Sequence, residues 1–246
     1  MRIKTGLTVA IAGALTFALG GCGLTGQIRT EDQSQEYAER VSRVEIELDS
    51  GDVVFSPATG EVVSVSRRLR WRTDKPVVTE TFEGATMRVS VKCPRFGTCD
   101  VDYGVKVPAA ASVFVRTDSG DITLTGMTGG ADVRADSGNV RLDGAAGTVR
   151  AETDSGNIDG SGLLSGDLVA KADSGNIALT FVAVPAAVDA RADSGNVTLT
   201  VPQADGGYRV RADTDSGRRT VTVTESADAT RTIVATADSG NVTVRH

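Results

Sequence analysis

The sequence predicts an all-β protein whose main part is a parallel β-solenoid, similar to a β-helix, with an N-terminal β-cap region. A corner motif, Asp-Ser-Gly-Asn or a near copy, recurs seven times after residue 117, at spacings of 18, 18, 19, 20, 22 and 23 residues. Apolar residues alternate with polar ones on both sides of each corner, and a looser Gly-bearing return follows. One unit repeated at a nearly constant period indicates a stacked array and not scattered turns.

The corner motif contains the residue types that a sharp bend requires. Asp and Ser side chains can accept hydrogen bonds from backbone N–H groups a few residues further on, and Gly supplies a positive φ. The Asn after the Gly can form a side-chain amide ladder between coils that lie about 4.8 Å apart. The predicted corner glycines are Gly120, Gly138, Gly156, Gly175, Gly195, Gly217 and Gly240.

Alternating apolar residues flank each corner. Val113, Val115 and Thr117 precede the first corner at every second position, and Ile122 and Leu124 follow it. A period of two indicates a strand with one buried face. Ala is common before the corners, and Val, Leu and Ile are common after them, which predicts a narrow, dry core. We therefore expect about seven coils of 18–23 residues in residues 113–246.

Residues 1–21 predict a lipoprotein signal peptide. Arg2 and Lys4 form a short basic start, and residues 5–19 are an uncharged apolar run. The run ends in Leu19-Gly20-Gly21-Cys22, which resembles a bacterial lipobox. The resemblance implies that Cys22 is acylated with diacylglycerol and becomes the mature N-terminus. We expect an exported protein that is lipid-anchored to the bacterial membrane and faces the cell exterior or the periplasm; an ordinary signal peptide is the alternative.

Two further regions precede the array. Residues 22–42 are polar and show neither helical nor strand periodicity, which predicts a flexible tether. Residues 43–112 begin with an isolated corner copy, Asp49-Ser50-Gly51-Asp52, flanked by apolar residues at the same offsets as in the later array, which predicts one coil-like unit. Strand-like runs follow at 61–72, 77–82, 86–92 and 101–107. Because the first edge of a solenoid needs a cover, we expect these runs to form the β-cap.

Cys93 and Cys99 enclose a five-residue loop. Exported proteins meet an oxidising compartment, so a disulfide is the simplest prediction for the two cysteines that remain beside Cys22. Half of a metal site or a redox pair is the alternative, but the sequence offers neither a second Cys pair nor a nearby His.

Two coils depart from the repeat. Gly160 stands where Leu is expected in the third coil, and Arg218 and Arg219 replace Asn and the apolar residue in the sixth. We expect a bulge in the sixth coil, after which Val221 and Val223 resume the inward set. The nearby arginines form either a basic patch or a set of solvated outer residues: Arg209, Arg211, Arg218, Arg219 and Arg231.

The array ends in Val244-Arg245-His246 without a cap sequence. We therefore expect the last coil of the chain to be an uncovered end of the stack. Its strand edges would be available for self-association or for a partner strand; the alternative is that its shortness and its terminal charges protect these edges.

The corner aspartates predict a column of carboxylates, with Asp118, Asp136, Asp154, Asp173 and Asp193 on successive coils. Two explanations of its stability stay open. Backbone N–H groups in each corner can cap each carboxylate, or Ca²⁺ can bridge neighbouring coils, for which each ion needs six to eight oxygen ligands. Capping is favoured because the Gly-Gly-x-Gly-x-Asp pattern of calcium-binding β-rolls is absent from the sequence.

Composition excludes several classes of function. A formal net charge of −6 disfavours nucleic acid as a partner, and an aromatic content of 4% leaves few rings for stacking. The only histidine is His246, so a Ser-His or Cys-His pair is hard to assemble. We expect neither a cofactor nor enzymatic activity. A carbohydrate-active β-helical enzyme, which needs a carboxylate cluster away from the corners, is the least favoured alternative.

The lipobox, the Cys-x5-Cys loop before a strand that ends in Val107-Pro108, and the repeated corners together resemble a bacterial family of exported β-strand-repeat proteins. That family has no assigned function and is described as "putative adhesins". The likeness covers about residues 44–246 and implies a β-solenoid at the cell surface, with no catalytic residues to carry over. We expect an adhesin-like or scaffold protein that binds a surface glycan or protein. An envelope-sensing or signalling accessory lipoprotein is the alternative.

Overall fold

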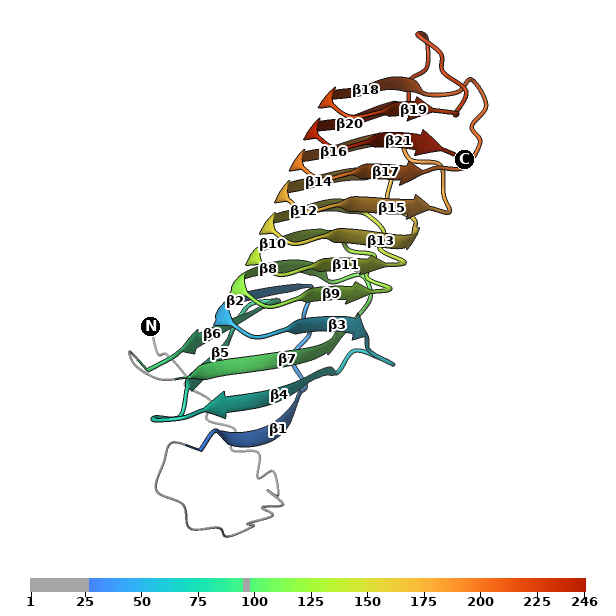
Figure 1. Ribbon diagram of the computed structural model, residues 1–246. Coiled ribbons are helices and arrows are strands. Elements are labelled where there is room, and N and C mark those ends of the chain that lie inside the picture. The colour runs from blue at the N-terminus through green and yellow to red at the C-terminus, as the bar shows by residue number, and fades with distance from the viewer. Residues whose placement is uncertain (1–26, 95–97) are drawn as a thin grey trace, which may run out of the picture.

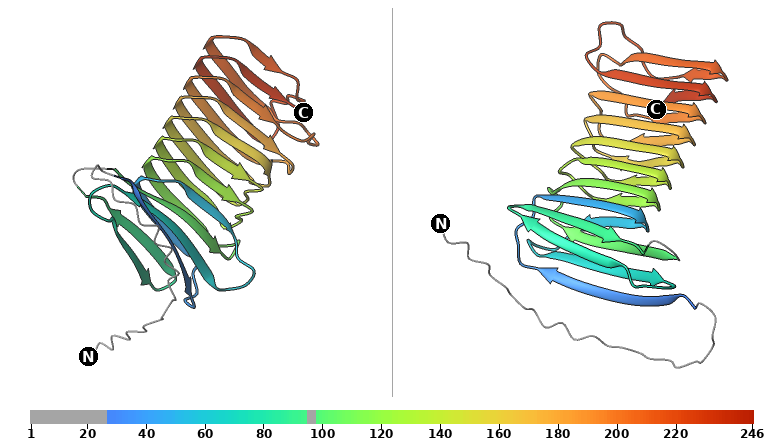
Figure 2. Two further views of the ribbon diagram at one scale, coloured as in Figure 1. Left: turned by 60° about the horizontal axis from the view of Figure 1, so that its bottom comes forward. Right: turned by 90° about the vertical axis from the view of Figure 1, so that its left-hand side faces the viewer.

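The computed structural model describes residues 27–94 and 98–246, which form two facing β-sheets wound into a solenoid (Figure 1). The predicted signal peptide (1–21), Cys22 and the first part of the predicted tether lie outside the described residues. The cap strands lie at one end of the stack, and regular coils extend from it to the other end (Figure 2). In the described part of the chain, no helix has the length and apolar character needed to cross a bilayer.

The strands of each sheet follow one another in space in an order that differs from their order in the chain. The eleven-stranded sheet contains β1 (Arg29–Tyr37), β4 (Val63–Trp71), β7 (Cys99–Val107), β3 (Val53–Pro57), β9 (Ile122–Thr125), β11 (Val140–Asp143), β13 (Ile158–Leu163), β15 (Ile177–Phe181), β17 (Val197–Thr200), β21 (Val242–Arg245) and β19 (Arg219–Val221). The ten-stranded sheet contains β18 (Arg209–Ser216), β20 (Thr232–Ser239), β16 (Ala187–Ser194), β14 (Asp167–Ser174), β12 (Thr148–Ser155), β10 (Ala131–Ser137), β8 (Ser112–Ser119), β2 (Arg43–Ser50), β6 (Thr86–Lys92) and β5 (Val77–Glu83).

Each coil consists of one strand of the ten-stranded sheet, a corner, one strand of the eleven-stranded sheet and a return. Neighbouring coils pair in parallel and in register, so that Val133 lies opposite both Val115 and Ala151. In the second sheet, Val140 lies opposite Ile122 and Ile158 in the same way. The predicted parallel β-solenoid is therefore the fold of this chain.

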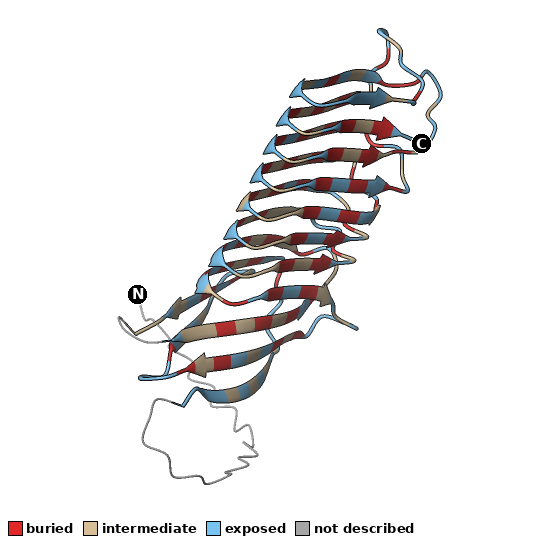
Figure 3. Cartoon of the chain, viewed as in Figure 1, coloured by how far each residue is buried: buried red, intermediate tan, exposed pale blue. Residues whose placement is uncertain are grey.

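The core is a thin aliphatic layer between the two sheets. Buried and exposed residues alternate along each strand (Figure 3), as the period of two predicts. Ile122, Val140, Ile158 and Ile177 are all fully buried, and Ala residues such as Ala151 face them from the ten-stranded sheet. Each coil buries its apolar residues only because another coil or the cap covers them.

The isolated corner copy is not isolated in space. β2 pairs with β8, and β3 pairs with β9, so the coil of Asp49 stacks directly on the coil of Asp118. The residues between these two coils leave the stack to form cap strands and then return. β2 and β3 therefore form the first coil of the solenoid and are not part of the cap, as the corner copy predicted.

The predicted cap strands are confirmed as β4, β5, β6 and β7. β4 and β7 form one antiparallel pair, and β5 and β6 form another. The tether prediction was wrong for residues 29–37, because they form β1, an antiparallel partner of β4 over nine residues. The inward positions of β1 are Glu31, Gln33, Gln35 and Tyr37, so hydropathy gave no strand signal. Backbone pairing with β4 and the exposed ion pair between Asp32 and Arg68 hold β1 in the sheet.

The predicted bulge in the sixth coil was also wrong. β19 pairs with β21 without a register shift, and Arg219 lies opposite the buried Val242. The irregularity falls in the third coil instead, where the register of β13 shifts between Gly160 and Leu163. A Cβ on Gly160 would lie 2.8 Å from a methyl carbon of Leu163, so Leu163 already fills the space that a side chain there would need.

The last two coils are stacked in the reverse of their chain order. β20 pairs with both β16 and β18, and β21 pairs with both β17 and β19. The final coil of the chain is therefore inserted between its predecessors, as the labels at the top of Figure 1 show. The prediction that the last coil forms the end of the stack was wrong. The coil of β18 and β19 lies there instead.

Candidate functional site

The outer face of the ten-stranded sheet carries most of the ordered charge of the solenoid. We call it the charged face and define it by three columns of in-register residues on eight strands. The first column is Glu45, Phe114, Asp132, Arg150, Val169, Asp189, Val234 and Arg211; the second is Glu47, Arg116, Arg134, Glu152, Lys171, Arg191, Thr236 and Asp213; the third is Asp49, Asp118, Asp136, Asp154, Asp173, Asp193, Asp238 and Asp215. These side chains point outward because the apolar residues between them point into the core.

Ion pairs order much of the charged face. Arg134 Nη2 lies 3.0 Å from Asp154 Oδ1 on the next strand, and Arg134 Nε lies 3.3 Å from Asp136 Oδ1 on its own strand. Arg191 donates two hydrogen bonds to Asp189, of 2.6 and 2.8 Å. Exposed pairs of this kind contribute only about 0–1 kcal/mol each to stability. Their main effect is to give the face a mixed pattern of positive and negative charge.

An aromatic contact marks the end of the face near the cap. The guanidinium of Arg116 lies 4.7 Å from the centre of the Phe114 ring, and that of Arg43 lies 5.9 Å from the same centre. Both distances are within the range of cation–π attraction. Phe114 and Arg116 therefore form a partly apolar spot beside the charged columns.

The third column is the predicted column of aspartates. Corresponding serines pair across neighbouring strands, as Ser137 does with Ser119 and Ser155, so each Asp lies beside the next. In the described residues, Asp118, Asp173 and Asp193 are exposed and form no ion pair, and no Asp of the third column accepts a backbone N–H. The capping explanation was therefore wrong for these carboxylates, which face solvent.

The cation explanation of the Asp column receives no support from the geometry. Within residues 27–94 and 98–246, no group of three or more His, Cys, Asp or Glu side chains is arranged to hold a metal ion. We therefore expect the thermal unfolding midpoint to be the same in millimolar Ca²⁺ and in excess chelator. A reproducible rise with Ca²⁺, absent from an Asp173→Asn and Asp193→Asn double variant, would contradict this expectation.

The predicted amide ladder at the corners is confirmed. Asn157 Nδ2 donates to Asn139 Oδ1 at 3.2 Å, and Asn157 Oδ1 accepts the backbone N–H of Asn176 at 2.9 Å. The same two contacts recur along the stack. In spatial order, the ladder residues are Asp102, Asp52, Asp121, Asn139, Asn157, Asn176, Asn196, Asn241 and Arg218. It begins with carboxylates and ends at Arg218, which joins through its backbone N–H only.

The corner glycines are needed mainly for space. Gly120, Gly175, Gly195 and Gly240 have φ between 144° and 152°, but Gly138, Gly156 and Gly217 are not in the positive-φ region. A Cβ on any of these seven would lie 1.7–2.1 Å from the carbonyl oxygen of the neighbouring corner glycine. The sequence correctly marked all seven positions, but the shared reason is the close stacking of the corner backbones.

Removing one rung of the ladder should weaken the stack. Asn157→Ala deletes the acceptor of the Asn176 backbone N–H, and a hydrogen bond of this kind contributes about 0.5–1.5 kcal/mol to stability. We expect a loss of that size in urea-induced unfolding. Asp159→Ala, which removes an exposed side chain from β13 two residues further on, should change stability by less than about 0.5 kcal/mol. Equal losses for the two variants would contradict a role for the ladder.

Asp121 makes the ladder sensitive to acid. Burial raises the pKa of Asp121, but hydrogen bonds from Asn139 and Arg141 outweigh it, so the pKa lies below its ordinary value. A folded-state pKa below the unfolded one stabilises the fold above about pH 4, and this contribution is lost as the pH falls through the folded value. Asp121→Asn should therefore reduce the acid-side loss of stability. The measurement is the free energy of unfolding of both proteins from neutral to acid pH. If it falls with pH as steeply in Asp121→Asn as in the parent protein, the role of Asp121 is contradicted.

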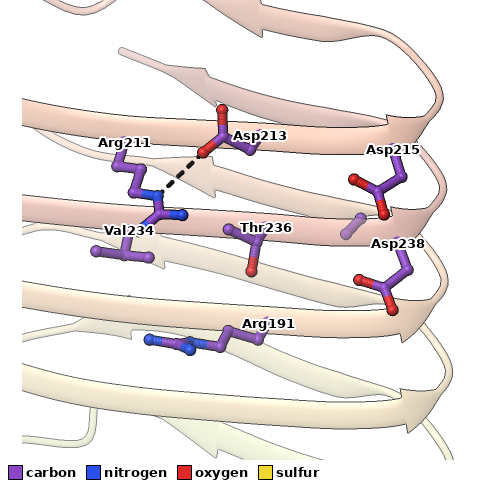
Figure 4. Close-up of a pocket in the computed structure, with 8 residues that line it drawn as sticks. Arg191, Arg211, Asp213, Asp215, Val234, Thr236 and Asp238 are labelled. Atoms are coloured by element: carbon purple, nitrogen blue, oxygen red, sulfur yellow. Dashed lines mark hydrogen bonds and ion pairs between the residues drawn. The ribbon is translucent and has the colours of Figure 1, made fainter.

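A hollow lies on the charged face near the inserted coil (Figure 4). Its volume is about 250 Å³, just below the ~300 Å³ typical of small-molecule sites. β20 supplies Val234 and Thr236 at positions where β16 supplies Asp189 and Arg191. The shorter side chains leave the hollow, which is lined by Arg191, Arg211, Asp213, Asp215, Val234, Thr236, Ala237 and Asp238.

The sequence did not reveal this hollow. In chain order, Arg191 and Arg211 would lie on adjacent strands, with no short residue between them. Only the insertion of β20 separates them. Arg209, Arg211, Arg218, Arg219 and Arg231 do not form one basic patch either. Arg209 and Arg231 donate to backbone carbonyls, and Arg211 pairs with Asp213.

The predicted disulfide is present. Cys93 and Cys99 are bonded, with their Cα atoms 5.7 Å apart, and Cys99 is the first residue of β7. The bond closes the loop between the end of β6 and the start of β7, so it fastens two cap strands that belong to different sheets. Cys22, the predicted lipidation site, is not among the described residues.

Several solved structures of bacterial proteins are similar to this chain. Similar structures are a "putative lipid binding protein" from Parabacteroides distasonis ATCC 8503 (11% identity, TM-score 0.49, 86% of this chain and 96% of that chain) and a "putative adhesin" from the same organism (13%, 0.44, 89% and 97%). A "putative adhesin" from Bacteroides fragilis NCTC 9343 is similar too (12%, 0.41, 87% and 96%). At these identities the likeness carries no argument about function.

Among curated proteins, none matches the chain. A family model described as "Toastrack DUF4097" matches residues 35–245, which include nearly all of the described strands. The resemblance to exported β-strand-repeat proteins agrees with this match. The chain therefore belongs to the Toastrack DUF4097 family.

Proposed function

We propose that this protein is an adhesin-like binding protein, held at the bacterial surface by a lipid on Cys22, that engages a surface glycan or protein through the charged face. The observation that carries the proposal is the in-register order of three columns of side chains on eight strands of one sheet. The function is binding and not catalysis.

The charged face has the size of a recognition surface. Eight strands at about 4.8 Å spacing span about 34 Å, and strands of seven or eight residues are about 25 Å long. The product, about 800 Å², equals one partner's share of a standard protein interface. The three columns run without interruption over eight neighbouring strands, so a partner contacts many coils at once.

The charged face is ordered before a partner arrives. Parallel hydrogen bonding fixes the strands, so the three columns keep their spacing, and ion pairs such as Arg134–Asp154 bias the long side chains toward their neighbours. Less conformational entropy is therefore lost on binding. The mixed charges favour a partner with a complementary pattern and disfavour one with a uniform charge. The hollow beside Thr236 adds a concave spot that fits one side chain or one sugar ring.

The position of the chain's first strand supports surface presentation. Arg29, the first residue of β1, lies at the cap end of the stack and follows Cys22 by seven residues, which span about 25 Å when extended. With the lipid on Cys22, the cap lies nearest the membrane and the coils of β16 to β21 lie farthest from it. The hollow then lies near the end of the stack that is farthest from the membrane.

A charge-reversal pair tests the proposal. Cells that display full-length protein are assayed for adhesion to glycan-coated and protein-coated surfaces, and bound proteins are recovered by cross-linking. Lys171→Glu changes the second column of the charged face, whereas Lys106→Glu changes an exposed residue on the outer face of the other sheet. We expect only Lys171→Glu to reduce binding. Equal binding by both variants and the parent would contradict the role of the charged face.

The same experiment separates the alternative function. If the recovered partner is an integral membrane protein of the same cell, an envelope-sensing accessory lipoprotein is the better description. Cys22→Ala should release the protein from the membrane fraction in either case. Retention of the Cys22→Ala form in that fraction would contradict lipid anchoring.

A further inference from the structure

The inserted C-terminal coil has a consequence beyond the proposed function. We propose that two copies of this chain associate by exchanging β20 and β21. Each copy inserts its residues 232–245 into the other copy, between the coil of β16 and β17 and the coil of β18 and β19. The partner is thus a second copy of this chain.

The coil of β18 and β19 is suited only to the end of the stack. Arg219 occupies an inward position, opposite the buried Val242. Its guanidinium donates to the carbonyl of Ala212 at 2.9 Å and lies 3.5 Å from Glu225. Stacking another coil over Arg219 would bury its charge, which is costly without a well-placed partner. The chain therefore cannot continue the stack beyond this coil.

The coil of β20 and β21 is suited only to the interior. Ile233, Ala235, Val242 and Val244 are fully buried. Asn241 donates to Asn196 on one side and accepts the backbone N–H of Arg218 on the other. The coil thus needs a neighbour on each side, and both neighbours precede it in the chain. It must enter a slot that already exists or that closes around it.

The connection to this coil is long enough for exchange. Ten residues, 222–231, separate β19 from β20, whereas three residues, 164–166, separate β13 from β14. Ten extended residues span about 33 Å, far more than the ~5 Å between neighbouring strands. A terminal element that pairs on both sides and has a long connection can be donated to an identical slot in another molecule, as in domain swapping.

Engineered cysteines detect the exchange. Ser194 on β16 pairs in register with Ser239 on β20. Full-length Ser194→Cys and Ser239→Cys chains with different tags are unfolded together, refolded at high concentration and oxidised. We expect a disulfide-linked dimer that carries both tags. Ser155→Cys and Ser174→Cys, an in-register pair on β12 and β14 with the short connection, form the control and should give no such dimer.

A chain with both Ser194→Cys and Ser239→Cys completes the test. It should form an internal disulfide at low concentration, which shows that the inserted arrangement exists in one molecule. An internal disulfide without any mixed dimer above the control would overturn the exchange. Failure to form even the internal disulfide would overturn the insertion and the exchange with it. Overturning the insertion would change the order of β16, β20 and β18 on the charged face, but Lys171 lies on β14, between β12 and β16. Binding by Lys171→Glu therefore stays a separate test of the proposed function.

Discussion

Replacing Gly175 by alanine is expected to destabilise the solenoid by more than about 4 kcal/mol, because the change forces neighbouring corners apart. Gly175 has a φ of 151°, and a Cβ there would lie 1.7 Å from the carbonyl oxygen of Gly156. The neighbouring atom is backbone and cannot rotate away. Moving it would disturb the hydrogen bond from the backbone N–H of Gly156 to Ser174.

Thermal unfolding measures this effect. A loss of about 4 kcal/mol in a chain of this size lowers the midpoint by about 8–16 °C. The matched control is Gly166→Ala in a return loop, where an added Cβ meets nothing within 4 Å. Its midpoint should change little. A Gly175→Ala protein as stable as the control would show that the corners are not stacked this closely.

Breaking the buried ion pair of the cap is expected to cost about 3–5 kcal/mol. Arg67 Nη1 lies 3.0 Å from Glu80 Oε1, and the side chains are only 15% and 5% exposed. Tyr37 donates to the other oxygen of Glu80, and burial together with this carboxylate raises the pKa of Tyr37. Because these groups come from β1, β4 and β5, the cluster joins the two sheets at the open end of the core.

Three variants separate the possible causes of this effect. Glu80→Ala leaves the guanidinium of Arg67 buried without its partner and should give the full loss in urea-induced unfolding. The double variant Arg67→Met and Glu80→Met should be more stable than Glu80→Ala, because no charge is left buried. Glu61→Ala breaks the exposed pair with Arg40 and should cost less than about 1 kcal/mol. Equal losses for Glu80→Ala and Glu61→Ala would contradict a buried pair.

The repeat and its alternation were enough to predict the solenoid, its corner glycines, the amide ladder and the positions of four cap strands. β1 could not be predicted, because a polar edge strand is held by backbone pairing with β4, which leaves no hydropathy signal. The order of the last coils escaped prediction for a different reason. All coils share one register, so apolar pattern alone permits any coil to stack on any other, and Arg219 decides the order by excluding itself from the interior.

The charged face was partly predictable. Outward residues follow directly from the period of two, and the Asp column follows from the corner motif. The hollow was not predictable, since Val234 and Thr236 lie between Arg191 and Arg211 only after β20 has been inserted. The prediction that backbone N–H groups cap the first Asp of each corner was wrong. The Asn or Asp three positions later accepts the backbone N–H of the neighbouring corner instead, as Asn139 does from Asn157.

The most direct test of the stacking is a methyl NOE spectrum of protein with labelled Leu and Val methyl groups. Leu199 lies in register with Val244, and Val244 lies in register with Val221. We predict NOEs from Val244 to both Leu199 and Val221, and none between Leu199 and Val221. A Leu199–Val221 NOE without one from Leu199 to Val244 would mean that the coils stack in chain order, and the account of the inserted coil and its hollow would be wrong.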